Sequence, residues 1–254
     1  MKAQNLLKLK QSSQFAKLVP DFVVIRGRED LKVQTFDKEK VYAVRSSCVV
    51  EDGMKSSHAG EFKTLLKVKA SELTEAVQCV EESFGEHKGR IIIQEMVSSE
   101  LSGVIFTANP VGMLNEVVIV VGKGTGDKVV EDRVETSTYY YHIDDRICCY
   151  DGENLLSDVQ VRELTELALK IREFFGFEAD IEFAIADDRF FLLQVRPITT
   201  LAYGSSTIVL DNSNIVESYP GISLPLTQDF VREIYYRVFQ TLVWRLTKNM
   251  AMVH

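Results

Sequence analysis

Short apolar runs recur between residues 21 and 150, each alternating with polar residues or bounded by Gly, Pro, Asn or Asp. Runs of this kind are typical of β-strands. We therefore predict strands at residues 21–25, 41–47, 61–69, 91–97, 102–107, 116–121, 136–143 and 146–150, the last two being paired across a short turn.

Apolar positions at helical spacing predict a short helix near the amino terminus and longer helices over residues 71–85 and 158–175. The last of these is the clearest, because Ser157 and Gln160 form a capping box and Gly176 stands where a carboxy-terminal cap belongs. Strands joined mainly by hairpin-like connections, mixed with helices, predict the α+β class.

The character of the sequence changes after Leu201. Residues 203–227 contain Gly, Ser and Pro and predict a linker followed by an irregular arm. A last amphipathic helix, over about residues 231–246, has an apolar stripe that no later sequence covers. We expect this stripe either to fold back on the domain or to contact a partner.

The most informative stretch begins at Asp180 and predicts a hairpin with its turn at residues 187–189. Side chains two positions apart share a face, so Asp180 points the same way as Glu182, and Gln194 the same way as Arg196. A three-residue loop places Glu182 opposite Gln194, and Asp180 opposite Arg196. A two-residue loop separates these pairs, unless a bulge restores the register.

Such a hairpin has two interpretations. Two acids, an amide and a guanidinium on one surface suit a metal–nucleotide site, because hard oxygen ligands then lie beside a fixed phosphate-binding fork. The alternative is a set of solvated polar residues on an open sheet face, which is common. The alternation alone favours the second interpretation.

Three further motifs have competing explanations. Arg45 ends an apolar strand beside Ser46 and Ser47, which suits a polyphosphate or, alternatively, a salt bridge to a nearby acid. The glycines between residues 122 and 126 lack the ending of a P-loop and favour a tight turn. His58 has no nucleophile–base pattern around it, and we interpret it as a surface or packing residue.

Composition narrows the possible functions. The chain has 254 residues, a net charge of −8 and no basic cluster, which argues against nucleic-acid binding. No apolar run is long enough for a membrane span, and there is no signal-peptide pattern. The four cysteines show neither metal-ligand spacing nor a disulfide framework, so we expect a reduced, cytoplasmic protein with no membrane partner.

Several motifs, taken in order, resemble the ATP/AMP-binding domain of pyruvate phosphate dikinase, which phosphoenolpyruvate synthase and rifampin phosphotransferase also carry. The resemblance covers about residues 41–201. It rests on Val44-Arg-Ser-Ser47, Glu51-Asp52, Ala59-Gly-Glu-Phe62, Gln94-Glu-Met-Val97, Ser102-Gly-Val-Ile-Phe-Thr-Ala-Asn-Pro110, Asp180-Ile-Glu182 and Leu193-Gln-Val-Arg-Pro-Ile-Thr199.

The resemblance implies an ATP-grasp fold, in which two α+β subdomains clamp Mg-ATP. We expect residues 1–90 to form a reduced amino-terminal subdomain and residues 91–201 the carboxy-terminal subdomain with the metal and phosphate site. Residues 202–254 would form a linker and an amphipathic helix leading to a further domain.

The resemblance also implies roles for individual residues. Arg45 and Arg196 would act on the ATP phosphates as the catalytic residues, while Glu182 and Gln194 would hold Mg²⁺. Lys2 stands in the position of the family's phosphate-gripping Lys. Gln94, Glu95, Met96 and Val97 would form the hinge whose backbone contacts adenine, and Thr107 would lie near the phosphates.

The implied function is that of an ATP-dependent phosphotransferase module that phosphorylates a histidine on a separate swivelling domain and leaves AMP. That partner domain would belong to another chain or to a further carboxy-terminal region. One alternative is a degenerate, non-catalytic nucleotide-binding or interaction module. A third is an ATP-grasp ligase that forms an acyl phosphate, although no carboxylate-substrate pocket is evident in the sequence.

Overall fold

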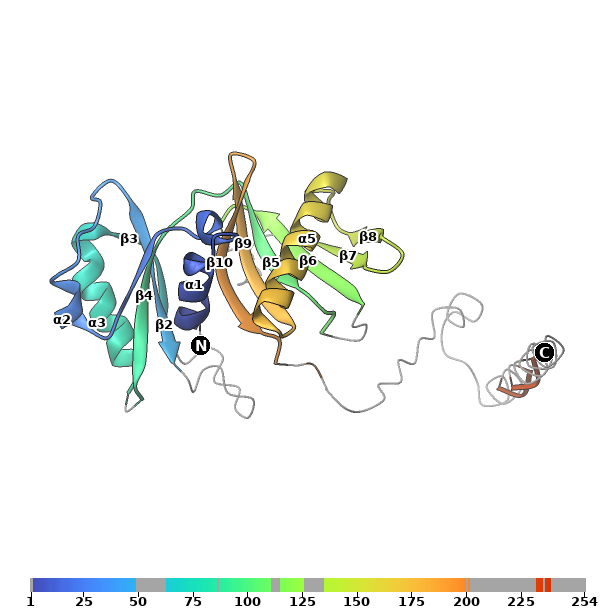
Figure 1. The fold of residues 1–254 in the computed structure, drawn as a ribbon, viewed down its shortest axis with the longest axis horizontal. Helices are drawn as coiled ribbons and strands as arrows, with labels where there is room; N and C mark the ends of the chain where they lie inside the picture. Colours follow the sequence, from blue (N-terminus) through green and yellow to red (C-terminus); the bar gives the residue numbers. More distant parts are fainter. Residues whose placement is uncertain are drawn as a thin grey trace. The chain divides into compact units, whose positions relative to one another are not determined.

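The computed structural model describes residues 2–48, 63–85, 87–110, 115–125, 135–199, 201, 232–234 and 236–238. The chain divides into two compact units, Met1–Ser205 and Ser206–His254. The first unit is α+β and contains two antiparallel sheets, as the strand-rich pattern predicts (Figure 1). In the second unit only short helical pieces within the predicted last helix are described.

The smaller sheet has four strands in the order β1-β4-β2-β3. These are β1 (Phe22–Ile25), β2 (Val41–Cys48), β3 (Thr64–Lys69) and β4 (Gly89–Glu95). Helix α3 (Leu73–Ser83) packs against it through Leu73, Val77 and Val80, which are buried with the side chains of β2 and β4. The 3₁₀ turn η2 (Ala70–Glu72) precedes α3, and the single-turn helix α2 (Arg28–Leu31) lies between β1 and β2.

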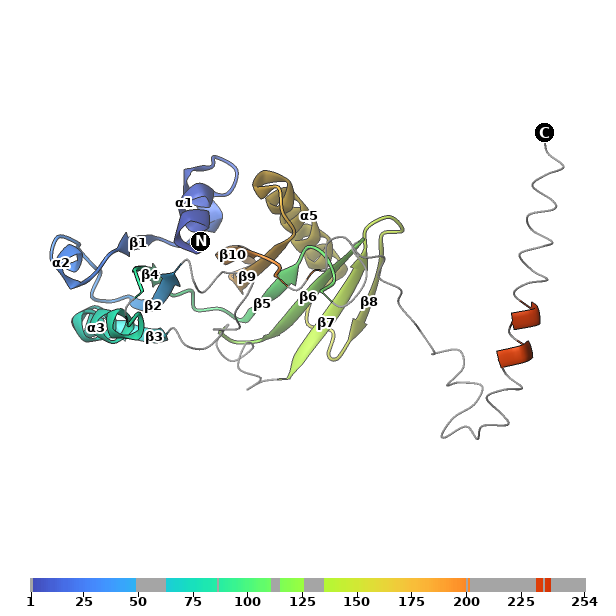
Figure 2. The same ribbon diagram turned by 90° about the horizontal axis from the view of Figure 1, so that it is seen from below.

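The larger sheet has six strands in the order β10-β9-β5-β6-β7-β8. Its strands are β5 (Leu101–Phe106), β6 (Glu116–Lys123), β7 (Thr136–His142), β8 (Ile147–Asp151), β9 (Ala179–Ala186) and β10 (Arg189–Pro197). Helix α5 (Asp158–Phe175) lies against one face of this sheet (Figure 2). Strands β7 and β8 pair as predicted, but the turn between them spans residues 143–146 and is longer than the predicted Asp144-Asp145 turn.

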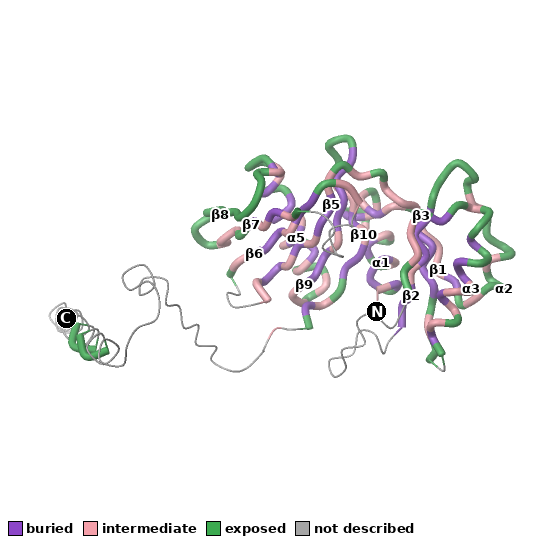
Figure 3. The backbone as a smooth tube through the Cα atoms, turned by 180° about the vertical axis from the view of Figure 1, so that it is seen from behind, coloured by how far each residue is buried: buried purple, intermediate pink, exposed green. Residues whose placement is uncertain are grey.

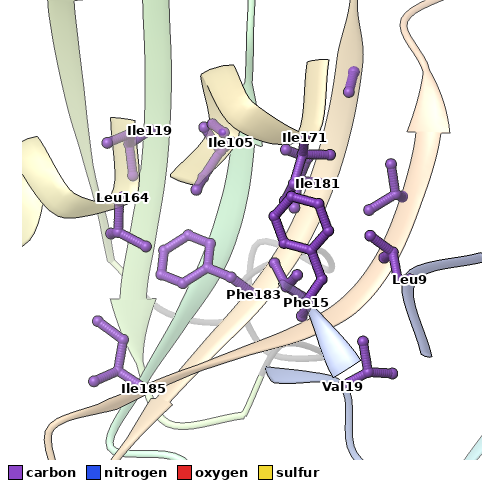
Figure 4. Packing of buried hydrophobic residues seen from close by; sticks show 14 of the residues in the cluster. Leu9, Phe15, Val19, Ile105, Ile119, Leu164, Ile171, Ile181, Phe183 and Ile185 are labelled. Carbon is purple, nitrogen blue, oxygen red and sulfur yellow. The ribbon is translucent and has the colours of Figure 1, made fainter. Parts of the chain in front are cut away.

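Helix α5 begins and ends where the sequence predicts. The Ser157 hydroxyl accepts a hydrogen bond from the Gln160 N–H, and the Gln160 side chain accepts one from the Ser157 N–H. Gly176 has a φ of 73°, a left-handed conformation that costs glycine nothing. Leu164 and Ile171 of this helix pack on Ile105, Ile119 and Phe183 of the sheet (Figure 4).

Helix α1 (Lys2–Gln11) connects the two sheets. It contacts β10 of the larger sheet and both β2 and β4 of the smaller one. The Ala3 N–H donates to the Ser47 hydroxyl, and the Asn5 side-chain amide donates to the Val195 carbonyl. Leu9 is fully buried in the core of the larger sheet, together with Phe15 just before the 3₁₀ turn η1 (Ala16–Leu18) (Figure 4).

Two features of the fold were not evident from the sequence. Strand β4 pairs with β1 on one side and β2 on the other, so the two sheets divide after Glu95, whereas we expected a boundary after residue 90. Strand β8 is exposed along its whole length at the edge of the larger sheet, in contrast to β6, which is mostly buried (Figure 3). All four cysteines are free thiols. Within the described part of the chain, no helix has the length and apolar character of a membrane span.

Candidate functional site

The hairpin of β9 and β10 has the register that brings its polar residues together, but it reaches that register in a different way from the expected loop. Arg189 pairs with Ala186, so the turn contains two residues, Asp187 and Asp188. Both have positive φ angles, 50° and 55°, as a type I′ turn requires. The expectation of a three-residue loop was therefore wrong.

A bulge supplies the missing shift in register. Leu192 pairs with Phe183, and the next pair along the ladder is Gln194 with Glu182, so Leu193 is the extra residue on β10. Beyond the bulge, Arg196 lies opposite Asp180. The bulge thus turns both polar pairs of the hairpin to the same face.

The polar residues form a connected group, which we call the polar cluster: Arg45, Asp180, Glu182, Gln194 and Arg196. The Glu182 carboxylate accepts a hydrogen bond of 2.8 Å from Arg45 Nη1 and one of 3.0 Å from Gln194 Nε2. Arg196 Nε donates to Asp180 Oδ2 over 2.7 Å. Because Arg45 belongs to β2, its ion pair with Glu182 joins the smaller sheet to the larger one.

The two carboxylates of the polar cluster have opposite electrostatic environments. Burial raises the pKa of Asp180, and its ion pair with Arg196 only partly opposes this. Burial also acts to raise the pKa of Glu182, but the charge and hydrogen bond of Arg45, with the charges of Lys2 and Arg196, outweigh it and hold that pKa below its ordinary value. Lys2, at the start of α1, therefore lies close enough to act on both acids.

A cavity of about 40 Å³ adjoins the polar cluster. The predicted hinge residues Gln94, Glu95, Met96 and Val97 all line it, as does Arg45. Its remaining wall consists of Ala43, Leu66, Ser99, Thr125 and Leu193. The cavity therefore lies between β2, β3 and β4 of one sheet and the bulge residue of the other.

Three polar atoms in this wall are buried without a hydrogen-bond partner among the described residues. They are Arg45 Nε, Gln94 Nε2 and Thr125 Oγ1. Buried polar atoms are nearly always paired, so three unpaired ones around one cavity indicate that a ligand or water completes them. Two of the three can only donate, and the hydroxyl can donate as well.

Some backbone N–H groups of the predicted hinge already donate hydrogen bonds to other backbone carbonyls. The Glu95 N–H donates to the Asp21 carbonyl and the Met96 N–H to the Val41 carbonyl, both over 2.9 Å. These two N–H groups are therefore not available to a base in this arrangement. Recognition would rest on the other hinge groups and on the side chains around the cavity.

Thr107 has partners of its own. Its side chain is fully buried, donates to Glu178 Oε2 and accepts a hydrogen bond from the Ala179 N–H, each over 2.7 Å. These bonds fix the start of β9, directly before Asp180. Other quoted motifs, including His58 and residues 51–52 and 59–62, lie outside the described residues.

The sequence patterns did not identify Thr125 as a site residue. The only indication was the glycine-rich stretch at residues 122–126, which we interpreted as a tight turn. Gly124 does turn the chain with a φ of 92°, and this turn brings Thr125 to the cavity.

The polar cluster has the donor atoms that a hard cation prefers: the carboxylates of Asp180 and Glu182 and the amide oxygen of Gln194. Mg²⁺ is usually held by one or two carboxylates together with substrate phosphates. No group of three or more His, Cys, Asp or Glu residues that could hold a metal occurs in the described part of the chain. Two carboxylates and one amide oxygen therefore suit a Mg²⁺ ion that is bound jointly with a nucleotide.

Comparisons with known proteins agree with this chemistry. An uncharacterized phosphotransferase, YvkC, from Bacillus subtilis is 32% identical over 202 residues, covering 63% of this chain and 24% of its own length. A probable phosphoenolpyruvate synthase from Methanocaldococcus jannaschii is 30% identical over 215 residues, covering 66% of this chain and 18% of its own length. The chain thus spans about a quarter or less of these two relatives.

A solved structure of an L-amino acid ligase from Bacillus licheniformis covers 76% of this chain and 40% of its own, with 11% identity and a TM-score of 0.44. A likeness at this level adds nothing to the assignment. The family model of the pyruvate phosphate dikinase AMP/ATP-binding domain, in contrast, matches residues 24–90, 86–151 and 149–215. Since these matches span most of the sequence, the chain belongs to the family of pyruvate phosphate dikinase AMP/ATP-binding domains.

Proposed function

We propose that this chain is an ATP-grasp module that binds Mg-ATP between its two sheets and supplies a phosphoryl group to a histidine on a separate domain. The observation that carries the proposal is the position of Arg45. Its unpaired Nε is at the wall of the cavity, and its Nη1 donates to Glu182, another member of the polar cluster. A base in the cavity and phosphates at the polar cluster would therefore lie on either side of one residue.

The charges of the site suit a polyphosphate. Arg45 and Arg196 come from opposite sheets, and Lys2 is directed to the same acids from α1. A guanidinium binds phosphate oxygens through a planar fork, and phosphoryl transfer depends mostly on positioning and charge neutralisation. In this proposal the three cations orient the phosphate chain and oppose the charge that develops on it.

Glu182 and Gln194 would hold Mg²⁺, with Asp180 keeping Arg196 in place through its ion pair. When bound, Mg²⁺ would neutralise part of the phosphate charge. Glu182 presently gives one oxygen to Arg45 and the other to Gln194. We therefore expect Arg45 to exchange its bond with Glu182 for a phosphate when the nucleotide enters.

The size of the cavity implies a movement on binding. The space of about 40 Å³ is close to the share of a single water in the liquid, about 30 Å³, so a purine needs more room than the cavity offers here. The cavity walls belong to both sheets, and the Arg45–Glu182 pair joins them. Nucleotide entry would thus widen the space between the sheets as that ion pair opens.

The phosphoryl acceptor would come from outside the described sheets. Of the described histidines, His142 pairs with Asp145 beside the β7–β8 turn, and His87 follows α3; neither lines the cavity. A histidine on a swivelling domain, as the family resemblance implies, meets this need.

One observation favours the alternative of a nucleotide-binding module without catalysis. Both oxygens of Glu182 are occupied inside the protein, an arrangement that is stable without any ligand. The two functions differ in their products. In this scheme the β-phosphoryl group of ATP passes to histidine, the γ-phosphoryl group passes to water as inorganic phosphate, and AMP remains.

The experiment is to mix the full chain with Mg-ATP and the swivelling histidine domain of a phosphoenolpyruvate synthase relative, and to follow AMP and acid-labile phosphohistidine. We expect both to accumulate together, and the reaction to disappear when the acceptor histidine is replaced by Ala. If the chain binds ATP but forms neither AMP nor phosphohistidine, the transfer function is contradicted and the alternative of a non-catalytic nucleotide-binding module is supported.

A further inference from the structure

Thr125 is held at the cavity by a turn that is tied down on both sides. The Gly124 N–H donates to the Glu100 carbonyl over 2.7 Å. The Gly124 carbonyl accepts hydrogen bonds from the Ser102 hydroxyl, at 2.6 Å, and from the Ser99 hydroxyl, at 3.1 Å. The residue before Thr125 is thus fixed to the segment that follows the hinge, so the position of Thr125 is set by the fold.

The Thr125 hydroxyl oxygen is buried and has no partner in the part of the chain that the structure describes. A buried hydroxyl without a partner is unfavourable, and a fold seldom retains one unless something else completes it. Here the same cavity holds two more unpaired donors, Arg45 Nε and Gln94 Nε2. The three atoms together point to a ligand that is rich in acceptor atoms.

The hinge backbone strengthens this conclusion. Since the N–H groups of Glu95 and Met96 already donate within the sheet, much of the donor capacity of the site is in side chains. An adenine ring has ring nitrogens that accept hydrogen bonds. Side-chain donors at fixed positions can recognise such acceptors, and a site built to hydrogen-bond a polar atom discriminates strongly against an analogue that lacks it.

We propose that Thr125 is a base-recognition residue: its hydroxyl donates a hydrogen bond to a ring nitrogen of the bound adenine and contributes to the choice of nucleotide. This inference rests on the proposed function, because it assigns the cavity to the base of ATP. It adds a residue from the glycine-rich turn to a site that the hinge and the hairpin otherwise form. Without nucleotide, the same hydroxyl would face water in the cavity.

The test compares Thr125→Val with the wild type by calorimetric titration of the full chain with Mg-ATP. Valine keeps the shape of threonine and removes the hydroxyl. We expect the dissociation constant to rise about three- to tenfold, the effect of one neutral hydrogen bond. Thr165→Val is the matched control, because Thr165 in α5 also has a buried hydroxyl without a partner among the described residues but does not line the cavity. Its binding constant should not change.

Analogues of ATP that lack single ring nitrogens identify the acceptor. The wild type should bind one of the 1-, 3- and 7-deaza analogues more weakly than ATP. Thr125→Val should bind that analogue and ATP with the same affinity. Thr125→Ser, which keeps the hydroxyl, should restore both affinity and discrimination, which separates recognition from a packing effect.

The outcomes distinguish the inference from the proposed function. If the wild type binds no nucleotide, both are overturned. If the wild type binds Mg-ATP, and Thr125→Val binds ATP and all three analogues as the wild type does, only the role of Thr125 is overturned.

Discussion

Glu182 shows how two opposing effects are balanced at a single residue. Its side chain is 24% exposed, and burial alone would favour the neutral acid. The guanidinium of Arg45, whose side chain is 15% exposed, reverses this and keeps Glu182 ionised. The pair can therefore stabilise the folded chain only while both members are present, because a buried charge without its partner is costly.

Arg45→Met should destabilise the chain at neutral pH by about 2 kcal/mol, since it leaves the Glu182 carboxylate without its cation. In the wild type the lowered pKa of Glu182 means that the pair stabilises the fold above the ordinary Glu value of 4.5, and that this contribution is lost as the pH falls through the lowered value. In the variant, Arg45 no longer opposes the effect of burial, so the pKa of Glu182 rises. The difference in stability between the variant and the wild type therefore becomes smaller at acid pH, where Glu182 is protonated in the variant.

Urea unfolding at neutral pH and at about pH 5 measures this difference. Asp180, whose pKa burial raises, is present in both proteins, so that only its interaction with the Glu182 charge differs between them. Arg26→Met, at an exposed arginine, serves as the control and should change stability by less than about 0.5 kcal/mol. A deficit in Arg45→Met that is equal at both pH values would show that Glu182 is not the residue Arg45 stabilises.

At the scale of single elements, features that depend on neighbouring residues in the sequence were predicted well, and features that depend on distant residues were not. The ends of α5 follow from Ser157, Gln160 and Gly176, whose bonds are within or next to the helix. The two-residue turn of the hairpin could not be chosen from the sequence, because Asp can adopt positive φ but also occupies other turn positions. No local sequence pattern marks the bulge at Leu193.

Two other elements illustrate the same limit. The pairing of β4 between β1 and β2 joins residues far apart in the sequence, so the sequence predicts that strand without its neighbours. Thr125 was missed because the burial of its hydroxyl is a property of the assembled cavity. Strand alternation, in contrast, predicted that Asp180 shares a face with Glu182, and Gln194 with Arg196, whereas their pairing across the hairpin depended on the turn and the bulge.

Helix α1 gives an element-scale prediction, since it packs between the sheets. Leu9 is fully buried in the core, whereas Leu7 is only partly buried. Leu9→Ala should therefore lower the free energy of unfolding by about 2–5 kcal/mol, through lost burial and the cavity left behind. Leu7→Ala, the same change on the other side of the helix, should lower the free energy of unfolding clearly less. Equal losses in thermal or urea unfolding would mean that α1 does not pack on the sheets through Leu9.

At the scale of the whole first unit, the two sheets are joined by α1 and by the Arg45–Glu182 pair, with the cavity between them. Everything proposed for the site follows from this arrangement, because one sheet supplies the hinge and Arg45 while the other supplies Glu182, Gln194 and Arg196. The central claim is that Mg-ATP binds where these groups meet. The family resemblance led to the same residues, but it gave neither the ion pair across the sheets nor the small volume of the cavity.

The most direct test is calorimetric titration of the full chain with ATP, with and without Mg²⁺, for the wild type, Glu182→Gln and Asp187→Asn. Asp187 is the control, since it is an exposed acid in the turn of the same hairpin. We predict that the wild type and Asp187→Asn each bind one ATP, and bind it about tenfold or more tightly with Mg²⁺ than without it. This is the effect of one contact to a charged group. Glu182→Gln should lose that gain. Absence of ATP binding by the wild type, or a full Mg²⁺ effect in Glu182→Gln, would contradict the account.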